Sequence, residues 1–161
     1  RKKIHTMCQV DILDLFHKME EKGLFLCSVE SLTGGLFAST ITGIPGASHI
    51  YKGSFVTYCN EIKNIIGVQK ETLEKYTAIS RKTAEEMVIN GVKKLNCNVG
   101  VSFTGNAGPE PSEGKPVGLI YISIYLKGKI YTYELNIVDE RNNVRKKCVE
   151  FALEKLYELI G

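Results

Sequence analysis

The stretch Val29-Glu30-Ser31-Leu32-Thr33-Gly34-Gly35 decides how this chain is interpreted. It follows residues 23–28, an apolar segment typical of a buried strand, and precedes residues 36–41, which can begin a helix. A turn there places Ser31 near the positive end of a helix dipole, where the N–H groups of residues 33–35 are predicted to receive an anion or a developing oxyanion. The alternative is a polar connection whose two glycines serve only the backbone geometry.

Helices and strands are predicted to alternate on both sides of this turn. The expected helices cover residues 8–22, 36–41, 61–66, 81–95 and 140–160. The expected strands cover residues 23–28, 51–58, 98–104, 117–126 and 129–138. Asn60, Ser80 and Asp139 are predicted to cap the three helices that follow them.

This order predicts an α/β fold, a layered α/β/α domain with a mixed β-sheet. Lys127-Gly128 joins the last two strands, so the sheet is expected to include a late antiparallel hairpin. We expect one domain over residues 1–161, with a flexible terminus over residues 1–7. Polar clusters at residues 30–35, 58–63 and 104–108 follow predicted strands, where ligands bind in such folds, so we expect them to converge.

Composition narrows the function classes. Twenty-one basic and 18 acidic residues give a net charge of +3, too small an excess to indicate nucleic-acid binding. No apolar run approaches the roughly 20 residues that span a bilayer, and no secretory signal is evident. Five dispersed cysteines, without a C-x-x-C pair, argue against a disulfide framework or a zinc site, and Cys27 and Cys97 are expected to be buried. We therefore expect a cytoplasmic protein.

Ser31 is a candidate nucleophile, which requires a base within hydrogen-bond reach. None of the three histidines stands in a promising place, so a Ser-His-Asp triad is poorly supported. Lys63 is the alternative base, because a desolvated lysine can lose its proton near neutral pH. Tyr58 could orient this pair or relay a proton. Taken singly, Lys63 could instead be a solvated lysine on a helix, and Tyr58 a half-buried tyrosine on a strand.

Together these clusters resemble the CinA C-terminal domain family. The resemblance is carried by residues 30–35, 55–63, 104–109 and 115–118, which occur in the family's order and spacing. Pro45-Gly46-Ala47-Ser48 is similar to a further family turn, and the resemblance extends from about residue 8 to residue 160. Enzymatic members are PncC-type nicotinamide mononucleotide amidohydrolases. The resemblance implies conversion of this nucleotide to nicotinic acid mononucleotide and ammonia, without a metal or redox cofactor.

The resemblance also implies roles for single residues. Ser31 stands at the position of the catalytic serine, Lys63 at that of its lysine partner, and Tyr58 is expected to assist them. The implied substrate-binding positions are Glu30, Thr33, Gly34, Gly35, Asn60, Thr104, Gly105 and Arg145. Arg145 is implied to lie near the substrate phosphate, which suits its planar guanidinium. We expect a small nucleotide as substrate, no nucleic-acid or membrane partner, and a homo-oligomer.

Three departures from the family pattern concern the pocket. Leu32 replaces a usual cysteine, Asn106 replaces a usual aliphatic residue, and the segment 110–114 lacks a Gly-Gly pair. They leave a rival open: a non-catalytic nucleotide-binding or protein-interaction module of the competence/damage-inducible type. A phosphatase or nucleotide hydrolase that uses the same anion-binding loops is a second rival, against which the lack of a dense Asp/His constellation argues.

Overall fold

The computed structural model describes residues 9–161, so the expected flexible terminus over residues 1–7 lies outside the described residues. Five strands form one open sheet in the order β2-β1-β3-β4-β5. The strands are β1 (Leu26–Glu30), β2 (Tyr51–Val56), β3 (Val99–Gly105), β4 (Leu119–Leu126) and β5 (Lys129–Asn136). β1 pairs in parallel with β2 and β3, whereas β4 is antiparallel to β3 and β5. The mixed sheet and its late hairpin are therefore confirmed.

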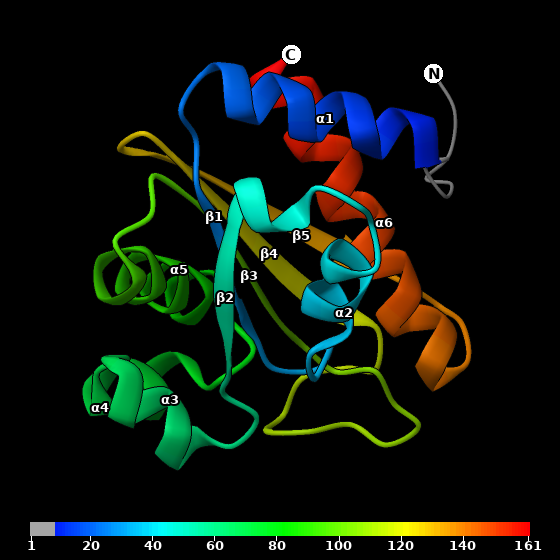
Figure 1. Ribbon diagram of the computed structural model, residues 1–161. Coiled ribbons are helices and arrows are strands. Elements are labelled where there is room, and N and C mark those ends of the chain that lie inside the picture. The colour runs from blue at the N-terminus through cyan, green and yellow to red at the C-terminus, as the bar shows by residue number, and fades with distance from the viewer. Residues whose placement is uncertain (1–8) are drawn as a thin grey trace.

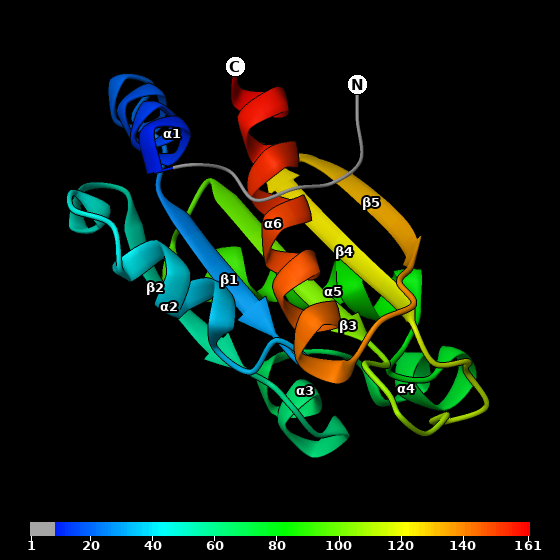
Figure 2. The ribbon, with the colours of Figure 1, turned by 90° about the vertical axis from the view of Figure 1, so that its right-hand side faces the viewer.

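Helices cover both faces of the sheet (Figure 1). They are α1 (Gln9–Glu21), α2 (Leu36–Thr42), α3 (Asn60–Ile66), α4 (Lys70–Tyr76), α5 (Arg81–Leu95) and α6 (Arg141–Ile160), with a 3-10 turn at Ala47–His49. Figure 2 shows α1, α2 and α6 on one side of the sheet, and α5 with the short helices α3 and α4 lies on the other. This arrangement confirms the layered α/β/α fold.

The sheet divides the buried apolar side chains into two clusters. The larger cluster fills the space under α1, α2 and α6 and includes the rings of Phe37 and Phe103, which are tilted by 47° with centroids 5.4 Å apart. The smaller one joins Val29 of β1 to Met87 of α5 and to Ile66 of α3. Because burial of apolar area is the main favourable term in folding, each face of the sheet holds its own helices.

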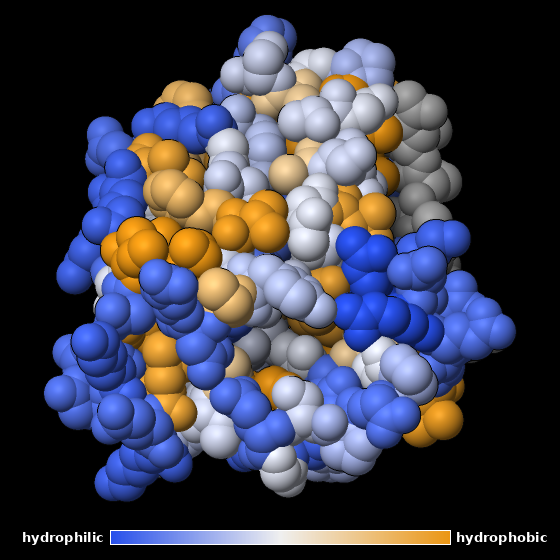
Figure 3. Space-filling view, turned by 90° about the horizontal axis from the view of Figure 1, so that it is seen from below, coloured by the Kyte–Doolittle hydropathy of each residue, from blue (hydrophilic) through white to orange (hydrophobic). Residues whose placement is uncertain are grey.

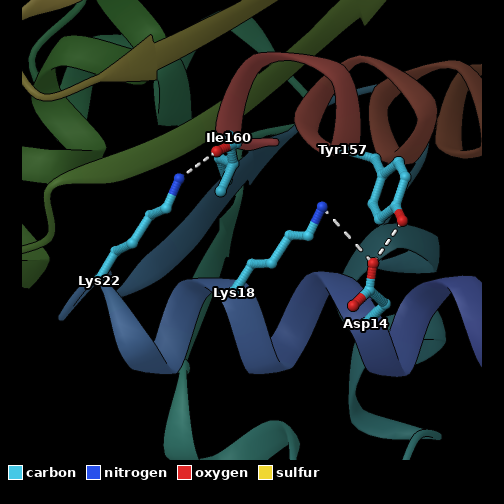
Figure 4. A network of polar contacts seen from close by, with 5 residues as sticks. All are labelled: Asp14, Lys18, Lys22, Tyr157 and Ile160. Atoms are coloured by element: carbon cyan, nitrogen blue, oxygen red, sulfur yellow. Dashed lines mark hydrogen bonds and ion pairs between the residues drawn. The ribbon is translucent and has the colours of Figure 1, made fainter.

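Polar contacts tie the two ends of the chain together across α1 and α6 (Figure 4). The Tyr157 hydroxyl donates a hydrogen bond to the carboxylate of Asp14, which also pairs with Lys18 at 3.6 Å. Lys22 Nζ donates to the carbonyl of Ile160. These contacts lie at the end of the molecule opposite the site described below (Figure 1).

The predicted elements agree with the structure most closely where the capping signal is local. Ser80 caps α5 as expected, since its Oγ accepts from the Thr83 N–H at 3.1 Å. The predictions for Asn60 and Asp139 were wrong: the N-cap positions belong to Cys59 and Glu140. Asn60 is instead the first residue of α3, and its side chain reaches a distant loop. Helix α4 was not predicted at all.

Two expectations drawn from composition can be compared with the described residues. Cys27, Cys59, Cys97 and Cys148 are free thiols, and Cys8 lies outside the described range. Cys27 is buried as expected, but Cys97 is only half-buried because it lies in the turn between α5 and β3. Among residues 9–161, no helix combines the length and the hydrophobicity that crossing a membrane requires.

The sheet topology brings three connections to one edge. The parallel strands β1, β2 and β3 all end at this edge, and antiparallel pairing brings the start of β4 and the end of β5 there as well. The connections that follow the three parallel strands begin at residues 31, 57 and 106. The predicted convergence of the three polar clusters is therefore confirmed, and its cause is strand direction.

Candidate active site

A cavity of about 540 Å³ lies at this edge of the sheet. Figure 3 shows the molecule from this end, with a hollow near the middle of the face. Six of the predicted site residues line the cavity: Ser31, Tyr58, Asn60, Lys63, Thr104 and Gly105. The rest of its wall consists of Leu32, Ala78, Ile79, the segment 106–113 and Arg141 at the start of α6. The other predicted residues lie behind this surface, with different tasks described below.

Ser31 and Lys63 form a direct contact inside the cavity. Lys63 Nζ lies 2.9 Å from Ser31 Oγ, within hydrogen-bond reach. Two backbone carbonyls fix the amine further, because Nζ also donates to Thr57 O at 2.7 Å and to Tyr58 O at 3.0 Å. The side chain of Lys63 is only 1% exposed, so these three contacts define its position.

Burial changes the acid–base chemistry of this lysine. Desolvation lowers the pKa of Lys63 from the ordinary 10.5 to about 8, while the nearby Glu113 and Cys59 oppose that shift. An ammonium group can donate to all three neighbours, Ser31 Oγ and the two carbonyls. A neutral amine can donate to the two carbonyls and direct its lone pair at the Ser31 hydroxyl. The same three contacts therefore suit both the protonated form and a general base.

Glu30 does not face the cavity, which corrects the expectation that it contacts a substrate. Its side chain is fully buried and accepts from the N–H groups of Gly35, Phe37 and Ala38 at 3.0–3.1 Å. The hydroxyls of Ser28 and Ser54 donate to it as well, at 3.1 and 3.2 Å. The positive end of α2 is therefore occupied by a carboxylate of the protein itself.

The N–H groups of Gly34 and Gly35 are likewise already used, so the expectation that they receive an oxyanion was wrong. Gly34 donates to the Ser31 carbonyl at 3.0 Å, and Gly35 donates to Glu30. Both residues have left-handed backbones, with φ of 55° and 100°. Glycine adopts these angles without steric cost, which lets the turn point its amides inward at Glu30.

Arg145 holds the back of the same turn rather than facing the cavity. Its Nε donates to Leu32 O at 2.8 Å, and Nη2 donates to Thr33 O at 2.9 Å. Its third nitrogen donates to the Asn142 side chain at 3.0 Å. All three nitrogens thus have acceptors, and the predicted contact with a substrate phosphate has no support from this geometry. Thr33 is also fully buried behind the turn, and its Oγ1 has no hydrogen-bond partner.

Arg141 stands where Arg145 was expected. It lines the cavity, and its guanidinium donates to the Gly108 carbonyl and, at 3.0 Å, to the hydroxyl of Tyr58. The Tyr58 side chain is 60% exposed, so its phenol lies at the mouth of the cavity and away from Lys63. Tyr58 orients the serine–lysine pair through its backbone carbonyl instead.

Thr104 and Asn106 shape the cavity wall. Thr104 Oγ1 donates to the carbonyl of Ala78 at 2.6 Å, which fixes the connection between α4 and α5 against β3. Asn106 Oδ1 accepts from the Gly108 N–H at 2.9 Å, so its amide closes the start of the 106–118 segment on itself. The departure from the family pattern at residue 106 therefore has a structural role.

Some backbone amides of the cavity wall have no hydrogen-bond acceptor within the described residues, and the N–H groups of Leu32 and Ala107 are among them. Leu32 and Ala107 both line the cavity, and no hydrogen bond from either N–H occurs within residues 9–161. Leu32 directly follows Ser31, and in α/β-hydrolases the residue after the nucleophile supplies an oxyanion donor. Sequence reasoning missed these amides, and for Leu32 the available signal was its place directly after the candidate nucleophile. Within the same described range, no group of three or more His, Cys, Asp or Glu could hold a metal ion.

Comparisons with known proteins agree with this fold. The family model of the CinA C-terminal domain matches residues 12–160. A protein of Bacillus subtilis (strain 168), provisionally named competence-damage inducible protein, is 38% identical over 143 residues, which cover 88% of this chain and 34% of the relative. A protein of the same provisional name from Clostridium acetobutylicum is 43% identical over 136 residues, which cover 83% and 33%. The chain spans about a third of the length of these curated relatives.

Solved structures share the whole fold. The competence/damage inducible protein CihA from Agrobacterium tumefaciens superposes with a TM-score of 0.88 at 34% identity, covering 96% of this chain and 98% of that one. A CinA superfamily protein from Enterobacter cloacae has a TM-score of 0.93 at 25% identity, with coverage of 100% and 96%.

Proposed function

Because the chain belongs to the CinA C-terminal domain family, we propose that its cavity hydrolyses the carboxamide of nicotinamide mononucleotide. The products are nicotinic acid mononucleotide and ammonia. One observation carries the proposal: a buried lysine amine, held by two carbonyls, lies 2.9 Å from a serine hydroxyl in a cavity open to solvent. This pairing is what an activated serine nucleophile requires.

Ser31 and Lys63 perform the covalent steps. The neutral amine of Lys63 takes the proton of Ser31 as Oγ attacks the carboxamide carbon, and a tetrahedral intermediate forms. Lys63 then gives that proton to the departing nitrogen, the C–N bond breaks and ammonia leaves. A water molecule, deprotonated by the same amine, then attacks the resulting ester. The ester bond to Ser31 breaks, Lys63 returns the proton to Ser31 Oγ, and the carboxylic acid is released.

The oxyanion is stabilised by backbone amides. The N–H of Leu32 is the first donor, because it adjoins the nucleophile and has no acceptor of its own in the described structure. Ala107, which also lines the cavity, offers a further N–H without an acceptor in the described structure. Backbone donors cost little reorganisation during the reaction because the fold already holds them in place.

Arg141 and Tyr58 recognise the nucleotide end of the substrate. Arg141 lies at the cavity wall, and only part of its donor capacity is used by Gly108 and Tyr58. A guanidinium pairs well with phosphate oxygens, and the exposed ring of Tyr58 offers a face for stacking. Binding of this remote group holds the carboxamide against Ser31.

An ammonia-release assay on nicotinamide mononucleotide tests the proposal. We expect wild-type protein to release ammonia and Ser31→Ala to release almost none. Ser48→Ala, at an exposed position in the 3-10 turn, is the matched control and should act like wild type. If the wild-type protein binds the nucleotide but releases no ammonia, the chain is a nucleotide-binding module of the competence/damage-inducible type.

A further inference from the structure

Glu113 is a cavity residue that neither the family motifs nor the catalytic steps above account for. It lies in the 106–118 segment and lines the same cavity as Ser31 and Lys63. Its backbone has φ of 52°, in the left-handed region that is uncommon outside glycine. A residue in that conformation persists only where contacts with the surrounding structure hold it.

Two other segments of the chain fix the carboxylate of Glu113. Its Oε2 accepts from Asn60 Nδ2 at 3.0 Å, and its Oε1 accepts from the Ala78 N–H at 3.0 Å. Asn60 begins α3, three residues before Lys63, so the contact falls one helical turn from the lysine. The charge of Glu113 is therefore fixed in place near Lys63.

The charge reaches the lysine. Burial lowers the pKa of Lys63, and Glu113 is the largest influence in the opposite direction, followed by Cys59. The other groups that contact the amine, Ser31 and the carbonyls of Thr57 and Tyr58, are uncharged. Glu110 and Arg141 are the remaining charged residues of the cavity wall.

We propose that Glu113 is a positioning residue of the Ser31–Lys63 pair. Its carboxylate pins the 106–118 segment to α3 and to the α4–α5 connection, and its charge favours the ammonium form of Lys63. Glu113 thereby sets the lower pH limit of the reaction, since a base must be neutral to act. The inference rests on the proposed amide hydrolysis for its kinetic readout, although not for its titration readout.

The pH profile of Glu113→Gln tests the electrostatic part. Activity should rise with pH as Lys63 loses its proton, with a midpoint near the pKa of about 8. Removal of the negative charge favours the neutral amine, so the midpoint should fall by roughly 0.5–1 pH unit. Well below the midpoint, that shift raises the rate relative to the variant's own plateau by about 3- to 10-fold. An unchanged midpoint would overturn the proposal.

Two further variants separate charge from position. Glu110→Gln removes a carboxylate from the same segment and cavity wall. Glu110 is not among the groups that shift the pKa of Lys63, so this change should leave the midpoint unchanged. Glu113→Asp keeps the charge but cannot span both contacts, so it should lower the plateau and leave the midpoint nearer to wild type. If Glu110→Gln moves the midpoint as far as Glu113→Gln does, the claim that Glu113 specifically sets the midpoint is refuted.

A titration that requires no turnover distinguishes this proposal from the catalytic one. The side-chain amine of Lys63 can be followed by NMR in lysine-labelled protein, with Lys63→Ala to assign its signal. Glu113→Gln should lower the observed pKa of Lys63 by the same amount, about 0.5–1 unit. If the wild type releases no ammonia, the amidase proposal fails while this measurement still decides the role of Glu113. An identical titration in both proteins would refute that role.

Discussion

Glu30 and Lys63 are two fully buried charged side chains at the same edge of the sheet, and they differ in what surrounds them. The Glu30 side chain accepts hydrogen bonds from three backbone amides and two serine hydroxyls. None of these donor residues lines the cavity. Lys63 contacts two carbonyls and one serine hydroxyl, and it lines the cavity. One charge is enclosed by the protein, and the other faces a space that a ligand can enter.

The difference shows how a buried charge can serve structure or chemistry. Every hydrogen-bond partner of the Glu30 side chain donates to it, so these contacts hold the turn between β1 and α2 in place. The Ser31 hydroxyl, in contrast, can both donate and accept. The hydrogen bond between Ser31 and Lys63 can therefore run in either direction. The desolvation that would be a pure cost for a structural lysine also brings its pKa into the range of a useful base.

The largest expected effect concerns catalysis at Ser31 and Lys63. Ser31→Ala and Lys63→Ala should each reduce kcat/KM for nicotinamide mononucleotide by roughly 1,000-fold or more. The double variant should lose little beyond either single variant, because the two residues act as one unit. Ammonia release measures the rates, and circular dichroism checks that each variant is folded. Near-normal turnover by Ser31→Ala would rule out a covalent mechanism.

The next effect concerns stability at Glu30. Glu30→Ala removes the acceptor shared by three backbone amides and two hydroxyls, so we expect a loss of about 3–5 kcal/mol in the free energy of unfolding. Glu30→Gln keeps one oxygen and should lose less. Urea denaturation measures both, with Glu74→Ala on the exposed side of α4 expected to stay within about 0.5 kcal/mol. If Glu30→Ala unfolds like the Glu74 control, the contrast between the two buried charges fails.

A third effect concerns the pH dependence of stability at Lys63. The folded pKa of about 8 lies below the ordinary 10.5, so between these values the unfolded chain binds more protons and stability rises with pH. The full gain from this residue is on the order of 3 kcal/mol. Lys63→Met lacks the titrating group and should show a flatter rise from pH 8 to pH 10 in urea denaturation. Parallel curves for the two proteins would show that Lys63 has an ordinary pKa.

The smallest effect separates the two arginines. Arg141→Ala should lower kcat/KM for the mononucleotide by a factor that corresponds to about 1.5–3 kcal/mol of lost transition-state stabilisation. Any slow hydrolysis of nicotinamide riboside, which lacks the phosphate, should barely change. Arg145→Ala should impair both substrates equally, because Arg145 holds the carbonyls of the Ser31 turn. Parallel assays on the two substrates measure both ratios. The reverse pattern would restore the phosphate contact expected for Arg145.

Some features could be predicted from the sequence because their causes are local. Ser80 and the apolar periodicity of residues 81–95 define α5 to the residue, and the glycine pair after Ser31 predicts the turn between β1 and α2. Strand direction then brings the polar clusters to one edge. Ser31 and Lys63 were predicted as partners from residue chemistry and family resemblance, and the structure places them 2.9 Å apart.

Only the tertiary structure decided how polar groups are paired. Whether the amides after Ser31 face a ligand or Glu30, and whether Arg141 or Arg145 enters the cavity, depends on contacts between residues far apart in the chain. Arg145 meets Leu32 across 113 positions, and Glu113 meets Asn60 across 53. A local pattern specifies which groups need partners, but the packing of helices against the sheet determines which partners come within 3 Å.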